Sequence, residues 1–314
     1  MARHIEFLDR GVVNSNYQVD LGPGSSDKAK LSGVWPPWPA TVRLRLTRSA
    51  EATDREAAIA RLLAGRNPTL APTELASERL DVPEPHTASL WSWLVGASLE
   101  ELTLDHAGQV LLAVDLAAAL GQLHDETLHG FGRLNPDLTV ARAPGFDRPA
   151  LRWLDDLARR IAVRLENPAH GLAPAVVSRL KLAVARAMAP LWSLAPVAGT
   201  LVHGDLSSGN IIIRMDDGHP RLAGLLDWEM ARSADPVVDA VSADFELTPR
   251  WPVLAAHLIE RLRTMTPEQW DRRFDLASMP LLLDSRMVAR VRHAELLLVR
   301  LDVRLNAIIE AWAG

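Results

Sequence analysis

The chain divides near Gly96 into two stretches with different sequence periodicity, and this division limits its possible folds more than any other feature. Before Gly96, apolar and polar residues alternate over short segments, a pattern typical of strands. After it come long segments with helical spacing, interrupted by one hairpin pattern at residues 210–226. We therefore expect an α+β protein with a small β-rich N-terminal part and a larger helical C-terminal part.

Individual elements follow from the same periodicities. In the clearest strand, residues 41–46, apolar side chains point to one face while Arg43 and Arg45 point to the other. A helix at 49–64 places Glu56 on its apolar, inward face. In all we expect strands at 7–9, 17–21, 41–46, 74–79 and 88–93, a Gly-, Pro- and Ser-rich loop at 22–40, and helices at 49–64, 105–126, 149–165, 174–194 and beyond 251.

Composition excludes several classes of protein. The 314 residues are 48% hydrophobic, which suffices for a large core, and the net charge of −5 gives no basic field for nucleic acid. The absence of cysteine excludes disulfides and thiolate chemistry. The start of the chain lacks a signal-like apolar stretch, and the longest apolar run, 111–123, contains Asp115 and is too short to span a bilayer. We expect a soluble cytoplasmic protein with no membrane contact and no obligatory protein partner.

The hairpin pattern carries the chemistry. Asp205 and Asn210 lie in a loop before one strand, and the return strand ends at Asp227 after a turn signal at residues 216–218. The fold-back therefore brings three oxygen-bearing side chains to one end of the hairpin. Phosphoryl transfer needs such groups, because one carboxylate orients the acceptor hydroxyl while others hold Mg²⁺. Aspartate and asparagine are also common in loops that only cap themselves, and the surrounding hairpin and β-rich part favour the functional interpretation.

Two segments of this region, HGDLSSGNIII and GLLDWEMARSADPVVDAVSADF, resemble the aminoglycoside phosphotransferase family. This family lies within a wider group that includes choline and macrolide kinases and shares the protein-kinase fold. The resemblance is specific through residues 201–245, weaker but collinear over about 5–130, and fades after 250. It implies a bilobal protein-kinase-like fold, with a nucleotide-binding lobe at 1–93 and a helical lobe at 94–314 that carries the catalytic loop and the acceptor site.

The resemblance also implies roles for individual residues. Asp205 is expected to be the catalytic base, Asn210 and Asp227 the Mg²⁺ ligands, and His203 a brace for the loop. Glu229 is expected either to tune the metal site or only to bond the backbone. Asp235 and Asp239 are expected to anchor the following helix.

On the nucleotide side, the family commonly uses a lysine on the third strand, and this strand contains none. Arg45 takes the matching place, with Glu56 as its expected partner, although a planar guanidinium is not equivalent to an ammonium group. Arg43 fits an exposed arginine on an edge strand. The loop before the second strand resembles the family's phosphate-covering loop, with Ser15 and Asn16 as candidates.

The segment 92–96 resembles the hinge that binds the purine edge of ATP or GTP, through backbone groups of Ser92 and Leu94. Trp91, just before it, is interpreted as a packing residue. On the acceptor side, residues 250–314 contain ten arginines against eight acidic residues. Kinases for polycationic aminoglycosides usually present an acidic surface, so this balance favours a less cationic acceptor, such as a macrolide or nucleoside antibiotic. Three tryptophans there could stack on a sugar but are more often core residues: Trp251, Trp270 and Trp312.

The leading hypothesis is an ATP- or GTP-dependent O-phosphotransferase that uses Mg²⁺ and modifies a hydroxyl group of a small molecule, an antibiotic in the first instance, which would confer resistance. One alternative is a metabolic kinase for an amino alcohol, a sugar or a homoserine-like substrate. The other is a nucleotide-binding pseudokinase, which the missing strand lysine keeps open although all three catalytic oxygens are present.

Overall fold

The computed structural model describes residues 4–8, 15–21, 41–67, 69–81, 86–141, 150, 152–193 and 198–313. The chain forms two compact units. The first contains Met1–Ala119, Leu134–Thr139 and Asp205–Ala231, and the second contains Leu120–Arg133, Val140–Gly204 and Arg232–Gly314. The segment Asp205–Ala231, which contains the hairpin, thus groups with the N-terminal unit, so the compact units do not follow the predicted boundary between lobes after residue 93. That boundary stays a prediction.

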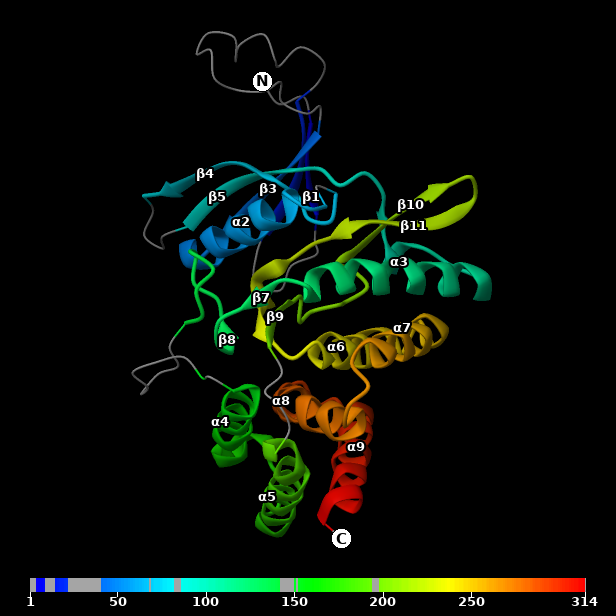
Figure 1. Ribbon diagram of the computed structural model, residues 1–314. Helices are drawn as coiled ribbons and strands as arrows, with labels where there is room; N and C mark the ends of the chain where they lie inside the picture. Colours follow the sequence, from blue (N-terminus) through cyan, green and yellow to red (C-terminus); the bar gives the residue numbers. More distant parts are fainter. Residues whose placement is uncertain are drawn as a thin grey trace. The chain divides into compact units, whose positions relative to one another are not determined.

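The first unit is built on a five-stranded antiparallel sheet. Its strand order is β1-β2-β3-β5-β4, which makes β3 the central strand. Helix α2 packs on β4 and β5 (Figure 1). It begins after Ser49, whose side chain accepts a hydrogen bond from the amide of Ala52 at 3.1 Å, as the sequence predicted. The bounds are β1 (His4–Leu8), β2 (Ser15–Asp20), β3 (Thr41–Thr47), α2 (Ala50–Ala64), β4 (Glu74–Leu80) and β5 (His86–Ser92).

The predicted hairpin is present in the same unit. Strands β10 (Ile211–Asp216) and β11 (His219–Leu225) pair antiparallel, and β6 (Ala97–Ser98) pairs with the outer edge of β10. The turn residues Asp217 and Gly218 both have positive φ, 50° and 79°. Two such residues are typical of the tight turn that matches strand twist. The Asp-Gly pair therefore fixes the register that delivers Asp227 to the loop end.

Helix α3 (His106–His124) corrects one expectation. Its 19 residues are long and apolar enough, by length and composition alone, to cross a membrane, so the argument that no apolar segment is long enough was wrong. Four of its leucines, Leu112, Leu116, Leu120 and Leu123, are nevertheless fully buried inside the protein. Their spacing of three and four residues is that of a core helix.

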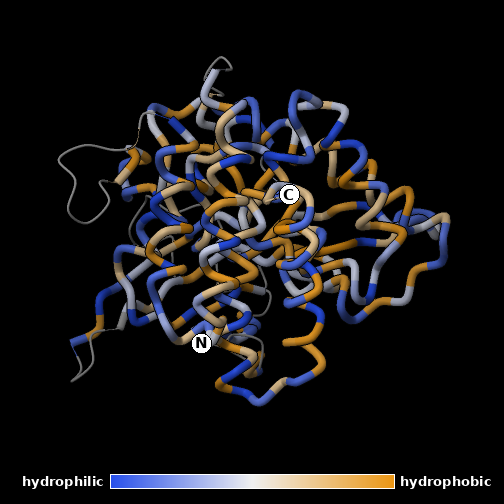
Figure 2. Tube along the Cα trace, turned by 90° about the horizontal axis from the view of Figure 1, so that it is seen from below, coloured by the Kyte–Doolittle hydropathy of each residue, from blue (hydrophilic) through white to orange (hydrophobic). Residues whose placement is uncertain are grey.

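The second unit combines a small sheet with helices. The sheet order is β7-β9-β12-β8, with strands of two to four residues that are too short for periodicity to predict. Apolar and polar residues alternate along the helical traces (Figure 2), as expected for helices with one buried side. The bounds are β7 (Thr127–Leu128), β8 (Gly132–Arg133), α4 (Trp153–Glu166), α5 (Pro174–Met188), β9 (Gly199–Val202), β12 (Arg232–Ala234), α6 (Val237–Leu247), α7 (Pro252–Met265), α8 (Trp270–Val291) and α9 (Glu295–Ala313).

The core of the second unit lies among α4, α5, α6, α8 and α9, which contact one another. Helix α5 ends at Met188 rather than near residue 194, and a short 3₁₀ segment follows it. Pro190 explains this difference, because its ring removes a backbone N–H that a continuing helix would need. Trp251 and Trp270 are buried, which confirms their interpretation as core residues. Trp312 is half-buried and donates a hydrogen bond to Asp275 at 2.8 Å.

Candidate active site

The loop before β10 holds Asp205 and Asn210 together. The Nδ2 atom of Asn210 donates to both the carboxylate and the carbonyl oxygen of Asp205, each at 3.1 Å. Leu206, the residue after Asp205, is fully buried and anchors the loop to the core of its unit. Asp205 itself is only half-buried. Its carboxylate is thus oriented by the protein and still open to a ligand.

Asp227 lies beside this loop because of the strand register. Ile211 pairs with Leu225, and the amide of Leu226 donates to the carbonyl oxygen of Asn210 at 2.8 Å. Asp227 is the next residue, and its backbone adopts the left-handed region, with φ 61° and ψ 71°. A non-glycine residue pays about 1–3 kcal/mol for such a conformation, and conformations of this kind cluster at functional sites. The predicted convergence of Asp205, Asn210 and Asp227 is therefore present.

Arg45 connects this loop end to the sheet and to α2. Its guanidinium bonds Glu56 through Nη1, and through Nη2 it approaches Asp227 at 3.2 Å and Glu229 at 3.4 Å. The predicted pair of Arg45 and Glu56 is thus formed, and both side chains are buried. The contacts with the two acidic residues after β11 were not predicted.

Burial and charge act against each other in this network. Burial raises the pKa of Glu56 to about 7, although Arg45 pulls it down. For Arg45, burial alone would lower the pKa, but Glu56 and Asp227 outweigh burial and raise it. One guanidinium therefore stays charged among three carboxyl groups, and the group as a whole attracts further positive charge.

The three acidic residues form a group that can hold a metal ion. Carboxylate oxygens of Glu56, Asp227 and Glu229 lie within 4.8 Å of one another. Oxygen donors of this kind suit Mg²⁺. The sequence predicted Asp227 with Asn210 as ligands, and the Oδ1 atom of Asn210 accepts no hydrogen bond within the residues that the structure describes. Glu56 was missed as a candidate ligand, since it was assigned only to Arg45, whereas Glu229 had been expected to tune the metal site or bond the backbone.

Arg55 is a further residue that sequence reasoning missed. Its side chain is almost fully buried, and its Nη2 atom donates to the carbonyl oxygen of Glu229 at 3.2 Å. Arg55 thus holds the segment that follows Asp227 directly, and its neighbour Glu56 acts on this segment through Arg45. The only sequence signal was a charged pair inside an otherwise apolar helix, which alone does not indicate what it contacts.

Strand β2 supplies the expected phosphate-side residues. Asn16 is buried directly opposite Arg45 in the sheet, and Ser15 precedes it at the start of the strand. Residues 11–14 of the predicted loop lie outside the described residues. The Oδ1 atom of Asn16 accepts a hydrogen bond from Arg43 at 3.0 Å. The prediction of Arg43 as an exposed edge-strand residue is wrong: β3 is the central strand, and burial lowers the pKa of Arg43 to about 10.

The two predicted hinge residues, Ser92 and Leu94, differ in whether their backbone groups are free to bind a purine. The amide of Ser92 donates to the carbonyl oxygen of Thr73 at 2.8 Å, so it is not open to a purine edge. Leu94 makes no backbone hydrogen bond of its own within the described ranges. Trp91 is buried and donates to Ser89 at 2.8 Å, as its interpretation as a packing residue requires. Any adenine-type contact here would therefore rely mainly on Leu94.

In the second unit, Asp239 on α6 holds the backbone that leads into the loop of Asp205 and Asn210. Its fully buried carboxylate accepts hydrogen bonds from the amides of His203 at 3.2 Å and Gly204 at 2.7 Å, and it pairs with His124 at 2.9 Å. Asp235 accepts from the amide of Val237 at 2.9 Å, at the start of α6. Only Asp235 therefore anchors the helix as predicted, while Asp239 anchors the loop.

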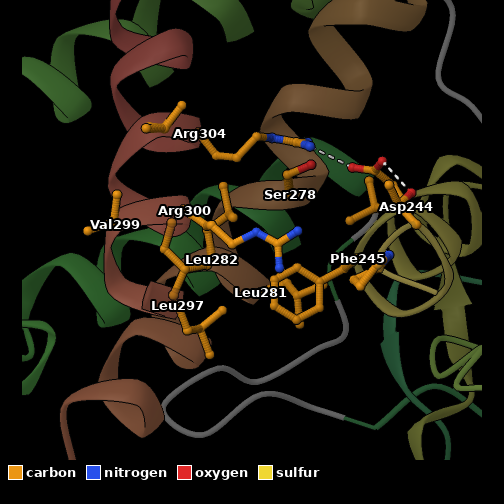
Figure 3. Close-up of a pocket in the computed structure, with 14 residues that line it drawn as sticks. Asp244, Phe245, Ser278, Leu281, Leu282, Leu297, Val299, Arg300 and Arg304 are labelled. Atoms are coloured by element: carbon orange, nitrogen blue, oxygen red, sulfur yellow. Dashed lines mark hydrogen bonds and ion pairs between the residues drawn. The ribbon is translucent and has the colours of Figure 1, made fainter. Parts of the chain in front are cut away.

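The second unit also contains a cavity of about 470 Å³ among α6, α8 and α9 (Figure 3). Its walls are largely apolar and include Phe245, Leu281 and Leu297. Arg304 bonds Asp244 at its rim at 2.7 Å. Asp244 and Phe245, the α6 residues among these, lie five and six positions after the loop-holding Asp239, about 8–9 Å further along the helix. The cavity also extends towards the loop-holding end of α6, because Val241 lines it two positions after Asp239.

Replacing Arg45 with methionine tests the network. Glu56 would lose its cation while staying buried, and we expect a loss of about 3–5 kcal/mol in the free energy of unfolding. The folded-state pKa of Glu56 already lies above its ordinary value of 4.5 and would rise further. A raised carboxyl pKa favours the folded state at low pH, so the loss grows as pH rises from about 5 to about 9. Urea unfolding across this range measures it.

Arg43→Met is the matched control, because Arg43 lies on the same strand but donates to the neutral side chain of Asn16. Its loss should be about 1–3 kcal/mol with no comparable pH dependence. Equal pH slopes for the two variants would contradict the assigned role of the Arg45–Glu56 pair.

Comparison with known sequences gives a family. The sequence model described as "Phosphotransferase enzyme family" matches residues 4–276. A protein named viomycin phosphotransferase, from Streptomyces vinaceus, is 28% identical over 156 residues, which cover 49% of this chain and 49% of that protein. The matched part is thus about half the length of that relative.

Comparison with solved structures gives the fold. A thermostable mutant of aminoglycoside phosphotransferase APH(4)-Ia, in a ternary complex with AMP-PNP and hygromycin B, has a TM-score of 0.71 and 18% identity, covering 100% of this chain and 96% of that chain. The GDP complex of wild-type aminoglycoside 2'-phosphotransferase-IIIa has a TM-score of 0.64 and 14% identity, covering 99% and 94%. The predicted fold class is thereby confirmed.

Proposed function

Because this chain belongs to the phosphotransferase enzyme family, whose sequence model matches residues 4–276, we propose that it transfers the γ-phosphoryl group of ATP or GTP to a hydroxyl group of a small molecule. The observation that carries this proposal is the convergence of Asp205, Asn210 and Asp227 at one end of a single hairpin. The buried cation Arg45 beside Asp227 supports it further. The sequence contains neither the G-x-S-x-G motif of many hydrolases nor the H-E-x-x-H motif of zinc proteases.

Each residue of the site has a role in this proposal. Asp205, held by Asn210, accepts a hydrogen bond from the acceptor hydroxyl and takes up its proton as the new P–O bond forms. The bond between the γ-phosphorus and the β-phosphate oxygen breaks in the same transfer, and ADP or GDP leaves. Arg45 is fixed by Glu56 and offers positive charge on the nucleotide side. Asn16 and Ser15 lie on the neighbouring strand, where the backbone would approach the phosphates. Most of the rate enhancement comes from this positioning of charge.

The residues present fit a divalent cation. Three carboxyl groups surround a single guanidinium, and their oxygens lie within 4.8 Å of one another. Asp227 and Asn210 would hold Mg²⁺, with Glu56 and Glu229 completing the acidic surroundings. When bound, Mg²⁺ neutralises negative charge on the transferring phosphates.

Replacing Asp227 with asparagine tests the metal assignment. Asparagine tolerates the left-handed backbone about as well as aspartate, so the variant removes a charge without adding strain. We expect Mg²⁺ affinity to fall at least about tenfold, because even the loss of residues that only hydrogen-bond to metal ligands lowers metal affinity by about 10- to 100-fold. Titration calorimetry with a non-hydrolysable nucleotide bound measures the affinity.

The control is Asp216→Asn, the same chemical change at the turn end of the same hairpin. Among the described residues, the Asp216 side chain bonds only Arg214, at the surface. Its Mg²⁺ affinity should stay at the wild-type value. An Asp227→Asn variant that binds Mg²⁺ as tightly as wild type would remove Asp227 from the metal site.

For the acceptor, we propose an antibiotic, with resistance as the consequence. The proposal draws on relatives named viomycin phosphotransferase and aminoglycoside phosphotransferase. The ten arginines against eight acidic residues over 250–314 favour an acceptor less cationic than an aminoglycoside, such as a macrolide or nucleoside antibiotic. A metabolic kinase for an amino alcohol, sugar or homoserine-type substrate is the second candidate, since it would use the same hairpin.

An acceptor panel separates these candidates. Nucleotide consumption would be measured with ATP and with GTP against aminoglycosides, macrolides, nucleoside antibiotics, amino alcohols and sugars. Consumption stimulated by an antibiotic supports the proposal, and stimulation by primary metabolites alone supports the second candidate. Nucleotide binding without acceptor-dependent consumption on any compound would instead indicate a pseudokinase.

A further inference from the structure

Strand β3 places two arginines on one face of the five-stranded sheet. Arg43 and Arg45 are two positions apart, so their side chains leave the same face, about 7 Å apart along the strand. Asn16 on β2 lies directly opposite Arg45 and therefore shares this face. These three residues and Asp227 all belong to the first unit, within which their contacts are described.

The hydrogen-bond donors of Arg45 are largely used inside the protein. Its Nη1 atom bonds Glu56, and its Nη2 atom approaches Asp227 at 3.2 Å and Glu229 at 3.4 Å. Its Nε atom is inaccessible to solvent. Arg45 thus contributes positive charge to the site, but few of its N–H groups are left for direct contact with a ligand.

Arg43 is held in place and still has donors to offer. Its Nε atom donates to Oδ1 of Asn16 at 3.0 Å, and its side chain makes no other hydrogen bond or ion pair within the described residues. Trp91, which faces Arg43 on β5, offers only an indole N–H, and that group already bonds Ser89. The Nη1 and Nη2 amino groups of Arg43 therefore have no protein acceptor in the described part of the chain.

Asn16 adds a further donor at the same place. A guanidinium has no acceptor atom, so the oxygen of the Asn16 side chain must face Arg43, which leaves the Nδ2 amino group for another partner. Nδ2 makes no hydrogen bond within the ranges that the structure describes. Arg43 and Asn16 together thus present only donors, and they carry one positive charge.

The carboxylates near Arg43 do not neutralise it. Burial, and after it the neighbouring Arg45, lower the pKa of Arg43 to about 10, whereas Asp227 and Glu56 act in the opposite direction. The side chain is therefore charged at neutral pH. The three carboxyl groups of the candidate metal site, on Glu56, Asp227 and Glu229, would be matched in charge by Arg45 together with one Mg²⁺. Arg43 is then left as an uncompensated positive charge at a half-buried position.

We propose that Arg43, oriented by Asn16, binds phosphate oxygens of the nucleotide. This inference rests on the proposed function and adds a binding residue to its nucleotide site. Phosphate oxygens are negatively charged acceptors, so they suit a group that offers only donors and one positive charge, and a planar guanidinium bonds two of them at once. The two arginines of β3 thus divide the work: Arg45 joins α2 to the metal site, and Arg43 contacts the nucleotide.

The direction in which the Arg43 side chain leans favours phosphate over the purine base. Arg43 bonds diagonally across the β2–β3 pair to Asn16, the residue opposite Arg45. It therefore leans along the sheet towards Arg45 and Asp227. Ser92 of the predicted hinge pairs with the residue before Arg43 on β3, which is the other direction along the strand. Phosphates held by Mg²⁺ at Asp227 would lie on the side to which Arg43 leans.

Binding of a phosphate chain without a base tests this contact directly. Inorganic tripolyphosphate and non-hydrolysable analogues of ATP and GTP are titrated by calorimetry with Mg²⁺ at constant ionic strength. The variant is Arg43→Gln, because glutamine can still donate to Asn16 but carries no charge. We expect its affinity for all three ligands to be at least about tenfold lower than that of the wild type, through the loss of a charged hydrogen bond. Adenosine and guanosine should bind equally to both proteins.

Two further variants make the comparison specific. Arg79→Gln is the matched control, since Arg79 lies on β4 of the same sheet with its side chain 77% exposed, and its affinities should equal those of the wild type. Arg43→Lys keeps the charge without the planar pair of donors, so its affinity should lie between those of the wild type and Arg43→Gln. If Arg43→Gln does not fold, Arg43→Lys carries the test, with a loss confined to the ligands that contain phosphate.

The outcomes separate this inference from the proposed function. The inference is overturned if the wild type binds none of the phosphate-containing ligands, or if Arg43→Gln binds them as tightly as the wild type. It is also overturned if adenosine and guanosine lose affinity equally, because a merely structural role would weaken all ligands alike. Nucleotide binding that depends on Arg43, with no transfer to any hydroxyl compound, contradicts the proposed function and leaves the phosphate contact in place.

Discussion

Replacing Asp205 with asparagine is expected to lower kcat for phosphoryl transfer by roughly 10²- to 10⁴-fold, the usual contribution of a positioned base. Asparagine keeps the shape of the side chain but cannot take up a proton. The loop should keep its conformation, because the Nδ2 atom of Asn210 also donates to the carbonyl oxygen of Asp205 at 3.1 Å. Steady-state kinetics on an acceptor found by the panel would measure the loss.

The matched control is Asp217→Asn, an exposed residue in the tight turn at the far end of the same hairpin. Asparagine is favoured in such turns, so both activity and folding should be unchanged. Nucleotide affinity should be similar in wild type and in both variants. An Asp205→Asn enzyme with wild-type kcat and normal folding would remove Asp205 from the reaction.

A stability loss as large as that of Arg45→Met is expected from Arg273→Met. Arg273 on α8 bonds the fully buried Asp235 through two hydrogen bonds, at 2.9 and 2.5 Å. The variant would leave that carboxylate charged, buried and without its cation, which costs about 3–5 kcal/mol. Since Asp235 also bonds the start of α6, the loss should extend to the helix that holds the catalytic loop backbone. Urea unfolding measures the change in the free energy of unfolding.

Arg304→Met serves as the control for this prediction. Arg304 bonds Asp244 at 2.7 Å, but its side chain is 43% exposed, so water already screens the pair. The expected loss is about 0–1 kcal/mol. Equal losses from the two variants would show that burial does not determine the strength of the Asp235 pair.

Local sequence signals were sufficient to predict the hairpin and the meeting of three oxygen-bearing side chains at its end. The Asp-Gly turn sets the register, and the register brings Asp227 to the loop that contains Asp205 and Asn210. The pair of Arg45 and Glu56 was also predictable, because strand alternation and helix spacing each placed one partner on an inward face. These inferences needed only the periodicity of single elements and one turn.

Contacts that depend on packing between distant segments were not predictable. Nothing in the periodicity of α2 indicates that Arg55 reaches the carbonyl oxygen of Glu229, 174 positions away in the sequence. The error over Arg43 has the same origin. β3 is central because of the order of the strands in the sheet, and the sequence of a single strand does not indicate that order. The small sheet of the second unit was not predictable for another reason, since strands of two and three residues such as β8 and β12 are too short to carry any periodic signal.

The central claim is that this hairpin transfers a phosphoryl group to a small-molecule hydroxyl. The most direct measurement is mass spectrometry of the acceptor after incubation with wild-type protein, Mg²⁺ and ATP or GTP, beside the Asp205→Asn variant. We expect the acceptor to gain one phosphoryl group, bound at oxygen, with the wild type only. Nucleotide consumed without any change in acceptor mass, or equal product from both proteins, would contradict the claim.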